Sequence, residues 1–386
     1  MNQTVKQMTS FIVMDILERV EKMRAEGVSD IISMEVGEPD FDIPSSSKSA
    51  VEQALRRSNT HYTHSLGDEP LRQAICDLYR REYGVEVTSD RVMLTSGSSP
   101  AILMAMLLLC NPGDEVILSN PGYSCYANFV RAAHAVPVEV PVDAHTGFCY
   151  DVRELHSYIT PRTKAIFVNS PMNPAGTLMS PEVMKEIASL GLPVISDEIY
   201  HGLVYEGKAH SMLEFTDNTY VLNGFSKRFA MTGMRLGYMI APQSSMRDLR
   251  TLQQNLMICA PSLSQKAALA ALNEALKEGG DAERMRHAYD ERRRFLVPAL
   301  RSIGFVIESN PVGAFYVFAD ARRFLNDSRF PSDCYGLALD LLEHTHVAVT
   351  PGIDFGSRGE GYLRFSYATS LENIQEAVRR LKDYLS

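Results

Sequence analysis

The chain has 386 residues, a length that suits two domains or one large domain with a smaller companion. Hydrophobic residues make up 45% of it and charged residues 22%, the proportions of an ordinary folded globular protein. Its 38 basic and 47 acidic residues give a net charge of −9, and the basic residues cluster no further than Arg292 to Arg294. A nucleic-acid partner would require a concentrated basic surface, so we expect none.

The sequence also lacks the features of membrane, secreted and metal-binding proteins. The longest apolar run, Ala101 to Cys110, is about half of the ~20 residues that cross a bilayer, so it favours a buried helix. Asp15 and Glu18 interrupt the apolar N-terminal segment and leave no signal-peptide core, so we expect a cytoplasmic location. His61 and His64 have no further ligand cluster, and the six cysteines form no C-x-x-C pair, so we expect no metal.

Strand and helix patterns alternate up to about residue 242. Apolar runs predict strands at 91–97, 114–122, 135–142, 164–171, 192–198, 219–226 and 235–242, and helices at 99–110, 124–134 and 181–190. This alternation predicts an α/β domain with a mostly parallel seven-stranded sheet sandwiched by helices. The last two strands are too close in the chain for a crossover helix, so we expect one of them to be antiparallel.

The pattern changes after Pro242. Helices are predicted at 244–258, 262–278, 281–302, 333–344 and 371–385, with strands near 304–309, 313–319, 346–349 and 361–367. These elements indicate a smaller α+β domain, to which the N-terminal segment up to about Pro44 is attached. The predicted division is 1–44 for the N-terminal arm and part of the small domain, 45–280 for the large domain and 281–386 for the small C-terminal domain.

Polar residues gather where the predicted strands end. In open α/β sheets, ligands bind outside the carboxyl ends of the strands. Ser98 and Ser99 follow the first strand and precede an apolar helix, whose N-terminal N–H groups favour an anion such as a phosphate. Serines before a helix are most often simple capping residues, so this motif is weak by itself.

The later strands end in residues with a stronger chemical signal. These residues are Asn173, Asp197, Tyr200, Lys227 and, eight residues after the lysine, Arg235. Each has an ordinary structural interpretation as a turn residue, helix cap, core residue or surface ion pair. Because all of them fall at the carboxyl edge of one sheet, separate ordinary interpretations are improbable.

This set of residues suits an aldehyde cofactor with a phosphate arm. A lysine in a partly desolvated pocket becomes a nucleophile for a carbonyl group. Arg235 and the seryl loop would bind the phosphate, and Asp197 would hold a pyridine nitrogen protonated. Tyr200 and Asn173 would bind a phenolate oxygen. Pyridoxal 5'-phosphate has all of these groups. Tyr123 would stack on the ring, with a core tyrosine as the alternative.

On these motifs the chain resembles the fold-type I pyridoxal-phosphate-dependent enzymes, specifically the class I/II aminotransferases of the aspartate aminotransferase superfamily. The motifs run along nearly the whole chain: "VGEPDFDIP", "HYTHSLGDEPLR", "TSGSSPAI", "NPGDEVILSNPGYSCY", "NSPMNPAGT", "SDEIY", "NGFSKRFAMTGMRLGY", "NPVGAFYVF" and "GYLRFSYA". The resemblance implies that Lys227 forms the internal aldimine and acts as general acid and base. For the other residues, the resemblance implies the roles that the chemistry of the cofactor already suggested. These are pairing with the ring nitrogen for Asp197, binding of the ring oxygen for Tyr200 and Asn173, stacking for Tyr123 and phosphate binding for Arg235.

The resemblance also implies roles that the residue patterns alone do not. Gly224 stands where the family often has a phosphate-binding serine, which leaves Ser226 and the Ser98–Ser99 loop to share that contact. Tyr62 would reach the phosphate of a neighbouring subunit, so a homodimer is implied. Gly37, Asn173 and Arg364 would bind the substrate; for Arg364 this agrees with the bidentate fit of guanidinium to carboxylate.

The implied reaction is ping-pong transfer of an amino group between an L-amino acid and a 2-oxo acid. The runner-up is a carbon–sulfur β-lyase or another elimination enzyme on the same scaffold. A non-enzymatic regulatory module is the third hypothesis, and the complete lysine, aspartate and arginine set argues against it. The donor stays open, because Arg72, Arg131 and Arg228 cannot be placed opposite a substrate side chain from sequence.

Overall fold

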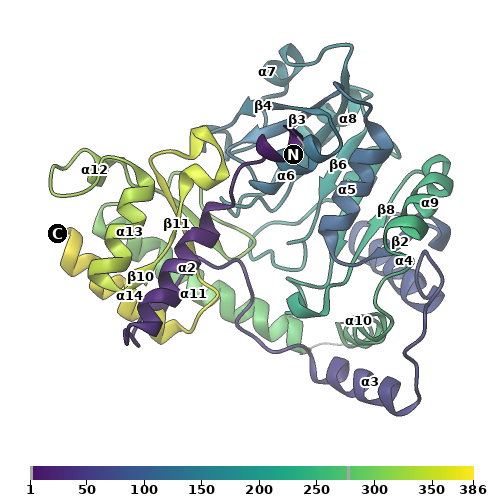
Figure 1. Ribbon diagram of the computed structural model, residues 1–386, viewed down its shortest axis with the longest axis horizontal. Helices are drawn as coiled ribbons and strands as arrows, with labels where there is room; N and C mark the ends of the chain where they lie inside the picture. Colours follow the sequence, from purple (N-terminus) through teal and green to yellow (C-terminus); the bar gives the residue numbers. More distant parts are fainter. Residues whose placement is uncertain (1–2, 276–278) are drawn as a thin grey trace.

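The computed structural model describes residues 3–275 and 279–386. The large domain, on the right in Figure 1, contains a seven-stranded sheet with the strand order β2-β8-β7-β6-β5-β3-β4. Its strands are β2 (Val92–Thr95), β3 (Glu115–Asn120), β4 (Val136–Pro141), β5 (Thr163–Asn169), β6 (Val194–Asp197), β7 (Thr219–Gly224) and β8 (Gly237–Ile240). The predicted α/β fold with a mostly parallel seven-stranded sheet is confirmed.

Helices cover both faces of this sheet. Val116 and Phe167 belong to an apolar cluster with α5, α6 and α9, whereas their neighbours Ile117 and Ile166 pack with α7 and α8 on the opposite face. Strands buried on both faces explain the continuous apolar runs of the sequence. The helices of this domain are α3 (Ser45–Arg56), α4 (Glu69–Tyr83), α5 (Ser98–Leu109), α6 (Cys125–Ala132), α7 (Val152–Ser157), α8 (Pro181–Ser189), α9 (Met246–Leu256) and α10 (Ser262–Ala275).

The expected antiparallel strand is β8, which pairs antiparallel with both β2 and β7. Strand β8 therefore begins at the sheet edge where β7 and β2 end. The short connection from β7 to β8 carries Lys227 and Arg235 along that edge. This reversal brings two distant motifs, the seryl loop after β2 and the lysine segment, to the same place.

The small domain, on the left in Figure 1, combines both ends of the chain. Ile16, Val20 and Met34 share one apolar cluster with residues between Met285 and Leu385, which agrees with an attached N-terminal segment. The exact domain boundaries stay a prediction. The elements of this part are α2 (Ile12–Ala25), β1 (Ile32–Ser33), α11 (Asp281–Ile303), β9 (Tyr316–Asp320), α12 (Arg322–Leu325), α13 (Cys334–Thr345), β10 (Val347–Ala348), β11 (Thr350–Pro351), β12 (Tyr362–Ser366) and α14 (Leu371–Leu385). The short N-terminal helix α1 (Gln3–Lys6) instead contacts α6 of the large domain.

Some predicted elements differ in detail. The expected strand at 304–309 forms a single bridge from Val306 to Asp320, and the nearby Ile307 carbonyl accepts a hydrogen bond from Arg301. The expected strand at 346–349 is divided, because β10 pairs with β1 while β11 pairs with β12. Of the helix predicted at 262–278, residues 276–278 lie outside the described residues. The sequence patterns did not predict α2, α3, α4 or α7.

Neither a membrane span nor a metal site is found within residues 3–275 and 279–386. No helix there is long and apolar enough to cross a bilayer. No group of three or more His, Cys, Asp or Glu residues in the same ranges could hold a metal ion.

Candidate active site

A cavity of about 350 Å³ lies between the carboxyl edge of the large sheet and the small domain. The lining includes nearly all of the residues singled out by sequence: Gly37, Ser98, Ser99, Tyr123, Asn173, Asp197, Tyr200, Ser226, Lys227, Arg235 and Arg364. Tyr62 is the exception, since its side chain is 79% exposed and it lies outside the cavity. The cavity therefore joins motifs that are far apart in the chain.

One end of the cavity is built to hold an anion. Helix α5 begins at Ser98, and its N-cap residue Gly97 has φ of 94°, a conformation that favours glycine. A Cβ atom on Gly97 would lie 2.6 Å from Nη2 of Arg235, and one on Gly237 would lie 2.7 Å from the Ser98 nitrogen. The glycines thus let the guanidinium lie against the helix N-terminus, where N–H groups and the helix dipole attract a phosphate.

Lys227 lies at the centre of the cavity wall. Its Nζ donates a hydrogen bond to the Gly37 carbonyl and lies 5.9 Å from the centre of the Phe315 ring. Desolvation lowers the pKa of this amine from 10.5 to about 8, an effect that Glu38 opposes and Arg364 reinforces. This lower pKa makes the neutral form of the amine far more populated near pH 7 than in an ordinary lysine, so the amine can act as nucleophile and base.

Asp197 is 5% exposed at the end of β6. Its Oδ2 accepts a hydrogen bond of 2.7 Å from the Tyr126 hydroxyl, and its Oδ1 accepts one of 3.1 Å from the Ile199 N–H. Burial raises the pKa of the carboxyl to about 6, and these hydrogen bonds oppose that rise. At neutral pH the group is mainly a carboxylate and can stabilise a proton on a heterocyclic nitrogen.

Tyr126 is a site residue that the sequence patterns did not predict. Its ring stacks on that of Phe167 with a centroid distance of 4.1 Å. This stacking fixes the position of the Tyr126 hydroxyl, which donates a hydrogen bond to Asp197. Its position three residues after Tyr123 could have indicated it, because residues three apart at the start of a helix share a face. The two tyrosine rings meet edge to face at 5.2 Å.

Tyr316 is a second residue that was not predicted. Its hydroxyl pairs with that of Tyr200 at 2.9 Å, and its oxygen leaves no room for a side chain on Gly37. Burial raises the pKa of Tyr200 well above its usual value, so Tyr200 is a neutral phenol that can donate a hydrogen bond. Tyr200 thus has a hydrogen-bond partner from the small domain that the sequence did not predict.

Arg364 enters the cavity from β12. Its Nη1 donates a hydrogen bond of 3.1 Å to Asn173 Oδ1, and its Nη2 donates one of 2.6 Å to the Glu35 carbonyl. The guanidinium carbon lies 4.4 Å from the centre of the Tyr316 ring and 4.9 Å from that of Phe355. Hydrogen bonds and aromatic rings therefore hold the guanidinium in a fixed orientation, which suits bidentate binding of a carboxylate.

The remaining wall of the cavity is mainly apolar. Helix α2 and the residue before it contribute Phe11, Val13, Met14 and Leu17. The charged lining residues are Glu38, Asp197, Lys227, Arg235 and Arg364.

The three arginines that the sequence left unplaced lie outside this cavity. Arg72 pairs with Glu69, and Arg228 pairs with Glu82 at 2.7 Å. Arg131 lines a different cavity. None of the three lines the cavity that contains Lys227.

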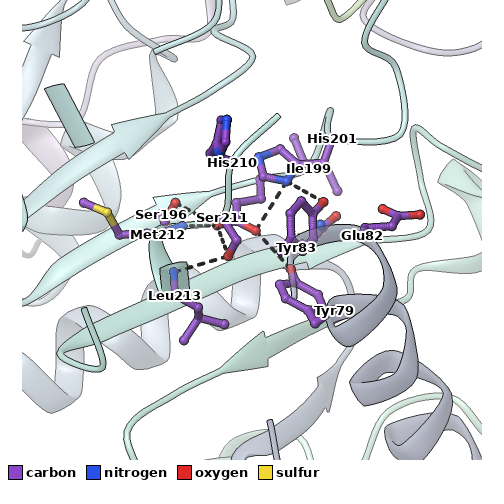
Figure 2. Close-up of polar contacts among 12 residues, drawn as sticks. Tyr79, Glu82, Tyr83, Ser196, Ile199, His201, His210, Ser211, Met212 and Leu213 are labelled. Atoms are coloured by element: carbon purple, nitrogen blue, oxygen red, sulfur yellow. Dashed lines mark hydrogen bonds and ion pairs between the residues drawn. The ribbon is translucent and has the colours of Figure 1, made fainter. Parts of the chain in front are cut away.

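A buried polar network supports the strand end that carries Asp197 (Figure 2). The Glu198 carboxylate accepts hydrogen bonds from the Tyr79 hydroxyl at 3.0 Å, from the Ser211 hydroxyl at 2.9 Å and from the Met212 N–H at 3.0 Å. The neighbouring His201 pairs with the Tyr83 hydroxyl at 2.8 Å. These contacts tie the end of β6 to α4 and to the 211–213 turn, so they hold the backbone of Asp197.

Fold and site together define a pyridoxal-phosphate-dependent transferase scaffold, and comparison with known proteins identifies the family. Residues 29–381 match the family model "Aminotransferase class I and II". The chain belongs to this family, and it is an aminotransferase.

Individual relatives cover almost the whole chain. A (5-formylfuran-3-yl)methyl phosphate transaminase of Methanocaldococcus jannaschii is 41% identical, covering 98% of this chain and 97% of the relative. A valine–pyruvate aminotransferase of Mycobacterium tuberculosis is 37% identical, covering 97% and 96%. The solved structure of Thermus thermophilus aspartate aminotransferase with maleate has a TM-score of 0.92 at 35% identity, covering 99% of each chain.

The hydroxyl of Tyr126 generates a first prediction. Tyr126→Phe removes a hydrogen bond to a buried carboxylate, which should raise the Asp197 pKa further and lower kcat about tenfold. The acid limb of kcat against pH should move to higher pH. The matched control is Tyr150→Phe. This change removes a buried hydroxyl that donates a hydrogen bond of 2.8 Å to the Phe167 carbonyl. An equal effect of both variants would show that Tyr126 is only structural.

The lowered pKa of Lys227 generates a second prediction, for the cofactor-free protein. Between pH 8 and 10.5 the unfolded chain binds this proton more tightly than the folded one, so the contribution of Lys227 to stability should rise with pH there. Lys227→Met should increase the free energy of unfolding at pH 7 by about 1–3 kcal/mol. Urea unfolding at pH 7 and pH 10 should show this advantage shrinking, and a constant advantage would contradict the lowered pKa.

Proposed function

We propose that the protein transfers the amino group of an L-amino acid with an uncharged, mainly apolar side chain to a 2-oxo acid, by a ping-pong mechanism with pyridoxal 5'-phosphate. The observation that carries this proposal is the convergence of Lys227, Asp197, Arg235 and Arg364 on one cavity. Each of the four side chains meets a different chemical requirement of the reaction. The reaction requires all four, which accounts for their presence in one cavity.

The residues present fit the cofactor. The glycine-bounded N-terminus of α5, together with Arg235 and Ser226, would hold its phosphate. Arg235 makes no ion pair with a carboxylate in the described parts of the chain, so its charge is available for an anion. Asp197 would pair with the ring nitrogen, Tyr123 would cover the ring, and Tyr200 with Asn173 would bind the ring oxygen. When bound, the cofactor supplies an electron sink for negative charge at the substrate Cα.

The chain's own groups account for the remaining steps. Arg364, with Asn173 and the backbone of Gly37, binds the substrate α-carboxylate and so orients the Cα–H bond. Lys227 would hold the cofactor, and its free Nζ would act as the base that takes the proton from the substrate Cα. The same amine, once protonated, would act as the general acid that gives the proton back. The reverse sequence with a 2-oxo acid would make the kinetics ping-pong.

The apolar wall supports an uncharged donor. Phe11, Val13, Met14 and Leu17 line the same cavity as Arg364, and Glu38 is the acid that most strongly raises the pKa of Lys227. Burying a second substrate carboxylate against apolar residues would be costly without a cation. The relatives are named for donors as different as aspartate and valine, so their names do not decide the donor.

We also propose a homodimer to which Tyr62 contributes. Tyr62, Leu256, Met257 and Ile258 are all exposed, a clustering of apolar side chains that suits a protein interface. Gln265 Nε2 donates a hydrogen bond of 3.0 Å to Thr63 Oγ1. This bond holds the Tyr62 segment beside the turn between α9 and α10. The cytoplasmic location stays a prediction from the sequence.

A panel of donors tests the proposed reaction. With 2-oxoglutarate as acceptor, leucine, phenylalanine and methionine should be converted with kcat/KM at least tenfold above that of aspartate, because of the cost of burying the second carboxylate. Pyruvate release from cysteine or cystathionine without any oxo acid would instead support the β-lyase alternative. Faster turnover of aspartate than of leucine would contradict the apolar donor while leaving transamination intact.

Arg364 generates a separate prediction. Arg364→Lys replaces a bidentate fork by a point charge, so kcat/KM should fall about ten- to hundredfold for every donor. The absorbance spectrum of the bound cofactor should change little. Arg322→Lys is the control, because Arg322 also lies over an aromatic ring, Tyr362 at 5.0 Å, but outside the cavity. If Arg364→Lys only lowered Tm and left kcat/KM unchanged, the assignment would be wrong.

A further inference from the structure

Helix α2 begins without a capping side chain of its own. Its N-cap residue is Phe11, which forms no side-chain cap hydrogen bond. The first N–H groups of a helix have no partner within the helix and require an acceptor from elsewhere. The missing acceptor is a residue from the other end of the chain.

That acceptor is Asp354. Its Oδ1 accepts a hydrogen bond of 2.6 Å from the backbone N–H of Ile12, across 342 positions of sequence. Asp354 is 5% exposed in the 3₁₀ turn Gly352–Phe355. Burial raises the pKa of this carboxyl to about 6, so above that pH a carboxylate faces the positive end of the helix. Arg364 and Asp15 are the charged groups that act on it, with opposite signs.

The same turn also contacts the residues that bind substrate. Phe355, the next residue, supplies one of the two rings over which the Arg364 guanidinium lies. The Phe355 carbonyl accepts a hydrogen bond of 2.8 Å from Gly122, the residue before Tyr123. One short turn thus touches α2, the carboxylate-binding arginine and the segment that carries Tyr123.

The face of α2 that is held in this way belongs to the substrate cavity. Val13, Met14 and Leu17 lie on the first turns of α2 and line the cavity, whereas Ile16 and Val20 pack into the small-domain core. The wall and the core therefore use adjacent faces of one helix, as the 3.6-residue period allows. A shift at the start of α2 would move the wall relative to Arg364.

We propose that Asp354 is a positioning residue for donor selectivity. By holding the start of α2, it fixes the distance between the apolar wall and the carboxylate-binding Arg364, and so favours long apolar donors over short ones. This inference rests on the proposed transamination, since it concerns the side-chain subsite of that reaction. Asp354 itself touches neither donor nor cofactor.

The test compares leucine and alanine as donors for the holoenzyme and for Asp354→Ala. A helix cap of this kind changes equilibria by about two- to thirtyfold, so kcat/KM for leucine should fall by that factor. Alanine, which does not reach the wall, should stay within about twofold of wild type by the same argument. Hydrogen exchange should also become faster in a peptide covering residues 11–17. Asp354→Asn, which keeps an acceptor oxygen, should lie between the two proteins.

The matched control is Asp151→Ala. Asp151 caps α7 by accepting a hydrogen bond of 2.9 Å from the Arg153 N–H, far from the cavity lining. This variant should lose stability without any change in the leucine-to-alanine ratio. Equal losses for both donors in Asp354→Ala, or unchanged exchange at 11–17, would overturn the inference. If Asp354→Ala fails to fold, Asp354→Asn decides by the same two readouts.

The two proposals fail in different ways. A wild-type enzyme that transaminates none of leucine, phenylalanine, methionine and alanine overturns the proposed function. A wild-type enzyme that converts both, with a ratio that Asp354→Ala leaves unchanged, overturns only the role of Asp354.

Discussion

Desolvation of Lys227 is the constraint on which the site depends. A charged ammonium in this position would be costly, and burial therefore lowers its pKa to about 8, close to neutral pH. The same burial raises the pKa of Asp197 to about 6. Both groups thus titrate near neutral pH, so one cavity contains an amine that can lose its proton and a carboxylate that can stabilise a nearby positive charge. The cost of these buried groups must be met by the rest of the fold.

The sheet topology makes this arrangement possible. Because β8 is antiparallel to β2 and β7, the connection from β7 to β8 stays at the edge where β2, β6 and β7 end. It thereby brings Arg235 against Gly97, while the Glu198 network holds the adjacent end of β6. The resulting cavity carries three cations, Lys227, Arg235 and Arg364, and two anions, Glu38 and Asp197. The cations exceed the anions by one, so the cavity attracts an anionic ligand.

Much of this site could be predicted from sequence, because parallel strands bring their ends to one edge regardless of the separation between them. Lys227, Asp197 and Asn173 each follow an apolar run directly, so their position needed only the fold class. Tyr126 and Tyr316 could not be predicted in this way. Tyr126 lies one helical turn after a predicted residue, and Tyr316 begins a strand of the other domain and reaches the site through the contact between domains. Tyr62 depends on a partner chain, so the fold of one chain does not decide its role.

The contact between Asp354 and Ile12 belongs to a third kind of feature, one with no local signature. An aspartate in a short turn and a helix that starts at a phenylalanine are each unremarkable by sequence, and the helix even has Asp15 in its first turn as an ordinary acidic residue. Only the fold shows that the buried acid supplies the cap. The small domain therefore does more than carry Arg364. It also holds the start of α2, whose residues line the cavity that Arg364 enters. Consecutive residues make these two contacts, because Asp354 accepts the hydrogen bond from Ile12 and Phe355 supplies a ring over which the Arg364 guanidinium lies.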